Sequence, residues 1–402
     1  MNRPFEIVVV GAGITGLTAA ALLAHSRHRD QMNITVVDAG KRPTFDRSND
    51  IALRVSAIAS GSVGILASID VWKGIEDQRA CPYRDMRVWD ACGYVDGPDT
   101  LRFEAAEFGV AELGFIVENK LIQNALLQDL DSLDQPVDYE TPIRSLVPMD
   151  NRFRVEVADG KSLPADLVVG ADGAGSLVRK SSDISIDAWR YPQSAFVTHL
   201  RPERNHQHTA WQRFLRSGPI ALLPLLDGRV SVVWSTSPEQ AELAIAASDD
   251  ELSDMLCEAT DSVLGRLTPA GPRASFPLKA QHANHYVLPG LALIGDAAHA
   301  VHPLAGQGAN LGLADAARLV SVIDEAIGND EHPGDLPVLR RYERSRKGAN
   351  KTMLYFLDGL NRLFSSESSS VAKFRGCGMR LFNRSGPIRQ HAVHIALGLN
   401  AR

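Results

Sequence analysis

Cysteine is scarce in this chain, which has four among 402 residues, at positions 81, 92, 257 and 377. No two of them form a CxxC pair, and no cluster of ligand residues accompanies them at the spacing of a metal site. Scattered single cysteines are typical of free thiols in a reducing compartment. We therefore expect no metal, no disulfide framework and no cysteine nucleophile.

Long apolar runs and targeting segments are missing as well. No stretch of about 18 uncharged apolar residues occurs, so no membrane-spanning helix is expected. The chain enters a predicted strand at Phe5, without the basic segment, apolar core and cleavage site of a secretory signal. We expect a cytoplasmic protein, for which any contact with the inner membrane would be peripheral.

The composition that remains is that of an ordinary globular enzyme, with 45% hydrophobic and 22% charged residues. The length exceeds what one core usually fills, which predicts two connected domains. The formal charge of −6 is unevenly distributed. From Leu336 to Arg402 there are thirteen Lys or Arg and three Asp or Glu, a local charge of +10 that leaves −16 for the remainder. Such a segment fits either a solvated basic face or contact with an anionic surface. We expect no nucleic acid partner.

The N-terminal segment has the pattern of a dinucleotide-binding unit. A β-branched strand is predicted over Phe5–Val10, and the motif Gly11-Ala-Gly-Ile-Thr-Gly16 follows it without a gap. An Ala- and Leu-rich helix over 17–24 and a second strand over 34–37 come next. Strand, glycine turn, helix and strand in this order indicate a Rossmann-type site.

Each motif residue has a physical role in that prediction. Gly11 permits the tight turn, Gly13 lets a pyrophosphate approach the backbone, and Gly16 lets the helix pack closely on the strand. Asp38 ends the second strand, 22 residues after Gly16, where it can accept hydrogen bonds from a ribose. These residues alone do not distinguish FAD from NAD.

Two further motifs favour FAD. The segment 166–179 contains Asp172-Gly173, and the segment 291–299 contains Gly295-Asp296, each after an apolar strand. Asp296 can bond a ribityl hydroxyl. Gly306 and Gly308 let the chain pass close to a flat ring. A helix predicted to begin near Gln307 would direct its N–H groups at the pyrimidine end of a flavin, where its positive end stabilises a reduced flavin anion.

The GxGxxG, DG and GD motifs together resemble those of flavoprotein aromatic hydroxylases related to p-hydroxybenzoate hydroxylase. Within that group, the stretch from His302 to Asp315, HPLAGQGANLGLAD, resembles the signature of the ubiquinone-biosynthesis hydroxylases. The resemblance covers nearly the whole chain. Further similar stretches are Leu53–Ala57, Val117–Asn119, Gly218–Leu225 and Tyr342–Arg346.

The resemblance implies an α/β fold, with a Rossmann-type FAD-binding domain, an inserted antiparallel-sheet substrate domain and a C-terminal helical segment. We expect residues 1–75, 100–180 and 280–330 to form the FAD-binding domain. Residues 76–99 and 181–279 would form the substrate domain, and residues 331–402 the helical region. Strands predicted over 195–200, 221–225 and 229–234 would roof a substrate pocket. Trp211, Phe214 and Trp234 would either line that pocket or pack in the core.

The resemblance also implies site residues. Arg54 would reach the FAD phosphates, and Lys120 or Gln123 would approach the cofactor, although members of that group often carry Arg at the position of Lys120. Asp172 and Gly173 are associated there with both FAD and the nicotinamide cofactor. The predicted cofactor-binding set is Gly11, Gly13, Gly16, Asp38, Arg54, Gln123, Asp172, Gly173, Gly295, Asp296, Gly306, Gly308 and Asn310.

No general base stands out in the sequence. His299 and His302 flank the predicted flavin loop, and we interpret both as structural. Pro303, Gly306 and Gln307 are the residues that we expect near the reacting face of the flavin, through backbone geometry.

The activity implied by the resemblance is hydroxylation of the ring of a polyprenylated phenol or quinol. FAD would be bound tightly and without a covalent bond, O₂ would supply the oxygen, and NAD(P)H would bind only transiently. One dinucleotide fingerprint suits this arrangement. Alternatives are a flavin reductase or oxidase of the same fold and a non-catalytic FAD-holding subunit of a biosynthetic complex. A halogenase is disfavoured because no WxWxxP motif occurs.

The segment after Pro333 has a helical pattern. Apolar or small residues recur near heptad spacing, broken by Arg346, at positions 339, 342, 349, 353, 356, 360 and 363. This stripe predicts either a helix packed on the main body or an interface with a partner. The last segment combines Phe374, Leu381, Phe382 and Ile388 with Arg380, Arg384 and Arg389. These arginines would either adhere to an anionic membrane or pair with acids elsewhere in the chain.

Overall fold

The structure, a computed structural model, describes residues 3–150, 152–302, 304–366 and 368–399. Its first strand, β1 (Phe5–Val10), lies within a six-stranded sheet. Strands buried on both faces need apolar side chains throughout, and β1 supplies them. The sheet order is β19 (Val287–Leu288), β20 (Leu291–Leu293), β12 (Leu167–Gly170), β1, β2 (Met32–Val37) and β8 (Val137–Asp138), all pairs parallel except β19–β20.

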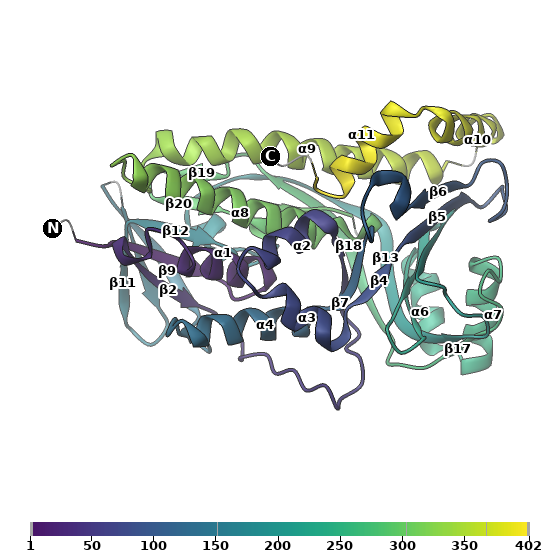
Figure 1. The fold of residues 1–402 in the computed structure, drawn as a ribbon, viewed down its shortest axis with the longest axis horizontal. Coiled ribbons are helices and arrows are strands. Elements are labelled where there is room, and N and C mark those ends of the chain that lie inside the picture. The colour runs from purple at the N-terminus through teal and green to yellow at the C-terminus, as the bar shows by residue number, and fades with distance from the viewer. Residues whose placement is uncertain (1–2, 151, 303, 367, 400–402) are drawn as a thin grey trace.

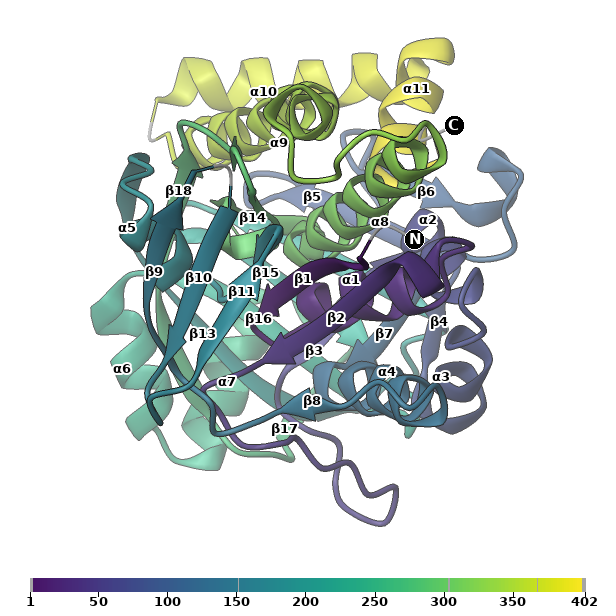
Figure 2. The same cartoon turned by 90° about the vertical axis from the view of Figure 1, so that its left-hand side faces the viewer.

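Helices cover one side of this sheet. The long helix α8 (Gln307–Gly328) packs along α1 (Ile14–Ala24), which also contacts α4 (Asn119–Ser132). A three-stranded sheet lies on the other side of β1 and β2 (Figure 2), formed by β9 (Ile143–Met149), β10 (Arg152–Val157) and β11 (Ser162–Ala165). The layers place the first glycine motif, which connects β1 to α1, beside the beginning of α8.

A second, nine-stranded sheet fills the right half of Figure 1. It is antiparallel except for the pair β5–β14. Helices α6 (Pro238–Ala246) and α7 (Asp249–Ala259) cover one of its faces and close a separate core. Its order is β21 (His299–Ala300), β18 (Ala274–Ala283), β13 (Ile186–Pro202), β16 (Val230–Thr236), β15 (Gly218–Pro224), β14 (Thr209–Leu215), β5 (Asp85–Asp90) and β6 (Leu101–Glu104), with β17 (Leu267–Pro269) paired to β13.

Short elements connect the two sheets. A small antiparallel sheet consists of β3 (Val55–Ala59), β7 (Gly114–Glu118) and β4 (Cys81–Tyr83). The remaining helices are α2 (Ser60–Ala67), α3 (Trp72–Arg79), α5 (Leu177–Ser181) and the 3-10 turns η1 (Arg29–Gln31), η2 (Ala105–Phe108), η3 (Gly295–Ala297) and η4 (Leu304–Gly306).

The C-terminal region is helical, as the sequence predicts. Helix α9 (Leu336–Phe364) packs on α8 and β19, and α10 (Ser369–Arg384) and α11 (Pro387–Ala396) follow it. All three lie at the top of the molecule in Figure 1. In the part of the chain that the structure describes, no helix combines the length and apolarity that a membrane crossing requires.

These elements confirm the predicted fold class of a parallel Rossmann-type sheet, a large antiparallel sheet and C-terminal helices. All strands of the six-stranded sheet fall within residues 1–75, 100–180 and 280–330, and we propose these segments as the cofactor-binding domain. The large sheet extends beyond residues 76–99 and 181–279, because β6 and β21 pair with its two edges.

The predicted stripe of α9 is only partly buried in its second half. Leu339 and Tyr342 are buried, and Met353 and Leu360 pack against the core, but Ala349, Phe356 and Leu363 are exposed. The positions buried there lie one residue later: Asn350, Leu357, Asn361 and Phe364. A straight helix repeats every 3.6 residues, whereas heptad spacing assumes 3.5, and the drift is about 20° per heptad. Over the length of α9, the accumulated drift approaches the rotation that separates two successive residues of a helix.

This register generates a stability prediction. Leu357→Ala should lower the free energy of unfolding by about 2–5 kcal/mol, because it leaves a cavity beside Phe364 and Met379. The adjacent Phe356→Ala should change it by less than about 0.5 kcal/mol, since that side chain is exposed. Denaturant unfolding followed by tryptophan fluorescence measures both. Equal losses in the two variants would contradict the observed register.

Candidate functional site

The glycine turn after β1 is shaped by close backbone approach. Gly11 has φ +106°, and a Cβ there would lie 2.4 Å from the carbonyl oxygen of Ala171. A Cβ on Gly16 would lie 1.9 Å from the carbonyl oxygen of Gly11. A Cβ on Gly13 would meet nothing within 4 Å. Gly11 and Gly16 are therefore required by packing, whereas Gly13 faces open space that a phosphate could approach.

Two side chains hold the peptide of Ala12 within this turn. Asp38 Oδ2 accepts from the Ala12 amide at 2.6 Å, and its Oδ1 accepts from the Gly40 amide at 2.6 Å. From α4, Gln123 Nε2 donates to the Ala12 carbonyl at 3.2 Å. Each Asp38 oxygen retains a further lone pair, so a ribose hydroxyl could still bind there.

The DG motif lies directly against this turn. Asp172 Oδ2 accepts from the amides of Leu177 and Val178, at 2.6 and 3.1 Å, and so caps the first turn of α5. Asp172 Oδ1 is buried without a hydrogen-bond partner among the described residues. A Cβ on Gly173 would meet nothing within 4 Å. An unpaired buried carboxylate oxygen is costly, and its position beside open backbone fits a polar ligand.

Side chains not identified from the sequence join the DG and GD loops. The buried Arg179 donates to the carbonyl oxygens of Ala297, at 2.7 Å, and Ala174, at 3.0 Å. Gln281 Nε2, from β18, donates to the carbonyls of Ala174 and Asp296 at 3.0 Å each. Burial lowers the pKa of Arg179. Gln281 belongs to no sequence motif. It reaches the two loops because β18, which carries it, pairs with β21 directly after the GD loop.

Asp296 is the acid of the GD motif. Its side chain is accessible to solvent, yet the surrounding protein raises its pKa through desolvation, against the opposing charges of His299, Lys279 and Arg54. The guanidinium of Arg54 lies 5.2 Å from the ring centroid of Phe276. Arg54 and Asp296, predicted to bind different parts of one cofactor, thus lie within electrostatic range of each other.

The beginning of α8 lies against β3. Gly306 has φ +62°, and a Cβ there would lie 2.9 Å from that of Ala57, while a Cβ on Gly308 would meet nothing within 4 Å. Asn310 donates to the Ala57 carbonyl and accepts from the Ala59 amide, at 2.9 Å each. Its amide therefore ties α8 to β3. Gln307 is the first residue of α8, as predicted, and Pro303 lies outside the described residues.

A buried carboxylate fixes the GD loop to the C-terminal helix. Asp315 is fully buried; its Oδ2 contacts His299 Nε2 at 2.5 Å and accepts from the Gly295 amide at 3.2 Å. Its Oδ1 accepts from Arg346 Nε at 2.7 Å and from Asn350 Nδ2 at 2.9 Å. Burial alone would raise the pKa of Asp315, but His299 and Arg346 outweigh it and lower the pKa to about 2.

An apolar row crosses one face of the large sheet. Val197, Val233 and Ala221 are paired across β13, β16 and β15, so their side chains share one face. This face is opposite the α6–α7 core, and all three remain partly accessible although strands flank them on both sides. Phe276 pairs with Ala195 on the same face and is also exposed. This face of the large sheet therefore presents an accessible apolar wall.

Two of the three aromatic residues considered for this wall are core residues. Trp234 belongs to the core under α6 and α7, and the ring of Phe214 stacks on Phe364 with centroids 3.9 Å apart. Trp211 is half-buried and lies under Arg87 at 5.3 Å. Of the two expected alternatives, lining the substrate pocket or packing in the core, Trp234 and Phe214 follow the second.

His302, at the start of the loop before α8, is buried and neutral near pH 7. Its Nδ1 accepts from the Leu304 amide at 3.3 Å, so its Nε2 carries the proton toward Gln193 Oε1, also at 3.3 Å. Burial lowers the pKa of His302 to about 4. The ring of Tyr191 meets it edge-on at 4.9 Å. These contacts give His302 a positioning role in the loop.

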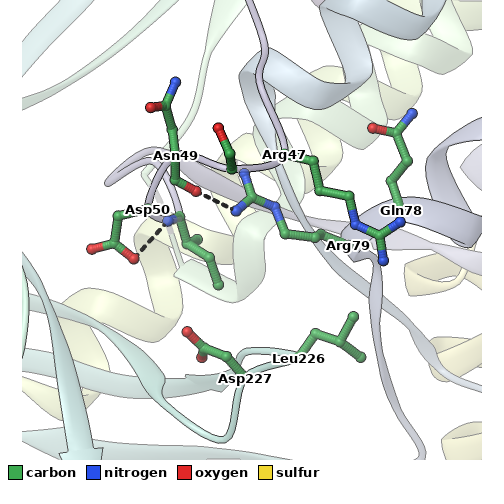
Figure 3. Close-up of a pocket in the computed structure, with 9 residues that line it drawn as sticks. Arg47, Asn49, Asp50, Gln78, Arg79, Leu226 and Asp227 are labelled. Atoms are coloured by element: carbon green, nitrogen blue, oxygen red, sulfur yellow. Dashed lines mark hydrogen bonds between the residues drawn. The ribbon is translucent and has the colours of Figure 1, made fainter.

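A separate pocket of about 570 Å³ lies between segment 47–51, α3 and the β15–β16 turn (Figure 3). Arg79 crosses it and donates to the Asn49 carbonyl at 2.7 Å. The pocket's two acids, Asp50 and Asp227, are both paired with Arg229. An aromatic ring is better accommodated by the apolar row than by this polar pocket. Among the described residues, no group of His, Cys, Asp and Glu is arranged to hold a metal.

Comparison with known proteins gives a consistent result. A family model described as FAD binding domain matches residues 5–356. The 3-demethoxyubiquinol 3-hydroxylase of Escherichia coli is 35% identical, with 99% of this chain and 100% of the relative covered. The ubiquinone biosynthesis monooxygenase COQ6 of Xenopus tropicalis is 33% identical, with 98% and 93% covered. A PqsL variant of P. aeruginosa superimposes with a TM-score of 0.77 at 21% identity, over 94% and 99%, which shows the fold.

The glycine turn generates a binding prediction. The purified protein should be yellow and release FAD on denaturation, and Gly13→Val should abolish this, because a branched side chain fills the open space beside the turn. Asp296→Ala should weaken FAD binding by about 1–3 kcal/mol. Flavin absorbance per mole of protein is the measurement. Gly74→Val, on an exposed helical face that is equally open, is the control. Full flavin content in Gly13→Val would exclude this site.

The buried His302 generates a pH prediction. Its pKa of about 4 in the folded protein lies below the ordinary 6.5, so the unfolded chain takes up the proton first as the pH falls. The free energy of unfolding should therefore decrease from pH 6.5 to 4, by about 3 kcal/mol for this group. His302→Gln should make the decrease shallower, whereas His391→Gln, at an exposed position, should leave it unchanged. Parallel slopes in all three proteins would refute the assignment.

Proposed function

The chain belongs to the family of FAD-binding monooxygenases that contains the ubiquinone-biosynthesis hydroxylases, and on this premise we propose that it hydroxylates the aromatic ring of a polyprenylated phenol or quinol intermediate of ubiquinone biosynthesis. NAD(P)H and O₂ are the proposed co-substrates. The observation that carries the proposal is the apolar row, which shares its sheet face with Phe276, the ring over which the guanidinium of Arg54 lies.

The proposed cofactor site follows from the contacts of its residues. Gly13, Gly173 and Gly308 leave backbone open to the cofactor, and Asp38, Asp172 and Asp296 offer carboxylate oxygens to its hydroxyls. Arg54 offers a positive charge to its phosphates. Six further residues act indirectly, because they hold the turns and helix ends in place. They are Gly11, Gly16, Gln123, Gly295, Gly306 and Asn310.

FAD, when bound, supplies the redox chemistry with NAD(P)H and O₂. The chain's own contribution is positioning and exclusion of water. The row of Val197, Ala221 and Val233 gives an electron-rich ring a dry surface, and Phe276 adds an aromatic contact. The N-terminus of α8 adds the positive end of a helix dipole, which would stabilise negative charge that develops on a bound cofactor.

His302 has a positioning role in this proposal. Its proton on Nε2 is held toward Gln193, and Nδ1 is occupied by the Leu304 amide, so it neither takes up nor releases a proton near pH 7. The row residues carry no titratable group. The ring therefore has to react as an electron-rich phenol or quinol through its position, without a general base from this wall.

The reaction generates a labelling prediction. With a short-chain prenylated phenol, the enzyme should consume NAD(P)H and O₂ and insert one oxygen atom, derived from ¹⁸O₂ and not from H₂¹⁸O. Mass spectrometry of the product reads this directly. Nicotinamide consumption without oxygen gain would instead indicate a reductase, and no flavin reduction at all would indicate a non-catalytic subunit.

A variant separates ring binding from cofactor binding. Val233→Phe should fill the apolar row, so substrate-dependent turnover should fall while flavin content stays normal. Unchanged turnover in this variant would show that the substrate ring binds at another surface. Loss of flavin would show instead that the substitution disturbs the cofactor site.

A further inference from the structure

Two of the sequence stretches that resemble the family lie against each other. Leu53–Ala57 leads into β3, and Val117–Asn119 contains the end of β7 and the first residue of α4. The two strands pair, and the Asn119 amide donates to the Arg54 carbonyl at 3.1 Å. The main chain of Arg54 is therefore held by the residues that lead into α4.

The carboxylate of Glu118 is buried between these stretches. Glu118 immediately precedes α4, but its side chain does not cap that helix. Its Oε1 instead accepts from the Ala52 amide at 2.7 Å. Arg79 of α3 compensates the charge, with Nη2 donating to Oε1 at 3.3 Å and Nε 2.9 Å from Oε2. Glu118 thus binds the main chain two residues before Arg54.

Burial of this charge is costly. Glu118 is 3% exposed, and burial raises its pKa, although the Ala52 amide and Arg79 oppose the change. Well-packed apolar residues in place of a buried ion pair are often equally stable or more so. Stability of the fold therefore does not explain why a carboxylate stands here, whereas its hydrogen bond to the Ala52 amide does.

Other contacts hold the same segment further from Arg54. Arg79 also donates to the Asn49 carbonyl at 2.7 Å, and Arg229 pairs with Asp50, whose side chain is 64% exposed. An ion pair with an exposed partner is weakened by solvent. On this side of Arg54, the carboxylate of Glu118 is therefore the buried anchor that lies closest in sequence, among the contacts of the described residues.

The side chain of Arg54 is exposed and forms no ion pair within the described part of the chain. Its guanidinium lies 5.2 Å from the ring centroid of Phe276 and within electrostatic range of Asp296. A long cationic side chain loses rotamer freedom when it binds a phosphate, and a fixed main chain keeps this cost from growing further.

We propose that Glu118 is a positioning residue for Arg54, because its carboxylate fixes the main chain at Ala52 and so directs the guanidinium to the cofactor phosphates. The inference rests on the proposed function, in which Arg54 binds those phosphates. The helix that follows Glu118 also carries Gln123, which holds the glycine turn through the Ala12 carbonyl. The beginning of α4 thus positions both the turn and the cation that a pyrophosphate would contact.

Titration of FAD into the cofactor-free full-length chain, followed by flavin fluorescence, tests the proposal. Arg54→Gln should raise the Kd of FAD about tenfold or more, because a charge-assisted hydrogen bond is lost. Glu118→Ala should raise it by a similar factor. Glu118→Gln should keep it within about threefold of the original value, since the amide oxygen still accepts from the Ala52 amide.

Asp90→Ala is the matched control. Asp90 is also a buried carboxylate that accepts from a main-chain amide, that of Cys92 at 3.0 Å, and pairs with a buried arginine, Arg375. It belongs to the large sheet, so its loss should destabilise the fold and leave the Kd of FAD unchanged. An increase as large as that in Glu118→Ala would overturn the positioning role.

A combined variant separates positioning from packing. In Arg54→Gln, the further change Glu118→Ala should raise the Kd less than about twofold, because Glu118 acts through a side chain that is no longer present. Independent effects would instead multiply to about a hundredfold. Multiplication, or equal losses in Glu118→Gln and Glu118→Ala, would overturn the positioning role and leave the cofactor site in place. An unchanged Kd in Arg54→Gln would overturn the phosphate contact and the positioning role together.

A second pair of variants applies where Glu118→Ala does not fold. Both members replace Arg79, so that no uncompensated charge is buried. Arg79→Leu/Glu118→Gln keeps an acceptor for the Ala52 amide, and Arg79→Leu/Glu118→Leu removes it. Only the second should raise the Kd, by about tenfold. Equal Kd values in the two would overturn the proposal. The titration requires no turnover, so these outcomes are independent of the reaction that the protein catalyses.

Discussion

The buried carboxylate of Asp315 is the point at which three parts of the molecule meet. Asp315 lies on α8. Its carboxylate accepts from the amide of Gly295 in the GD loop and contacts His299 at the end of that loop. It also accepts from Arg346 and Asn350 of α9. A buried charge is tolerated only where partners compensate its desolvation. The loop that carries Asp296, the N-terminus of α8 and the C-terminal helix therefore have to be positioned together.

Backbone proximity is the second constraint on the site. Gly11 lies against Ala171 and Gly16 against Gly11, while a Cβ on Gly312 would lie 2.4 Å from Thr15 Oγ1. These contacts bring β1, the DG loop, α1 and α8 close together. Arg179 and Gln281 then join the two loops by donating to backbone carbonyl oxygens, which the main chain presents whatever its side chains are. The cofactor motifs thus act as one unit because glycines allow them to approach.

The inner and outer faces of the C-terminal helices carry different kinds of residue. Their inner faces supply buried partners for the body, Arg346 for Asp315 and Arg375 for Asp90. Their outer faces carry exposed apolar side chains, among them Phe374 and Leu381. Arg346, which interrupts the apolar pattern of α9, and Asn350, which the heptad pattern misplaces, are the residues through which this helix fixes the candidate site.

The sequence by itself determined the fold class, the cofactor and the family, because these depend on short-range patterns. Glycine spacing after a strand and a helix start at Gln307 are local properties, and each is found where predicted. The tertiary structure alone decided which face of α9 is buried, that Asn310 binds β3, and that Val197, Ala221 and Val233 form one wall. It also decided that Arg375 pairs with Asp90, 285 residues away. Such pairings follow from strand register and helix rotation, which are set by contacts among residues distant in the chain, so no local pattern of residues contains them.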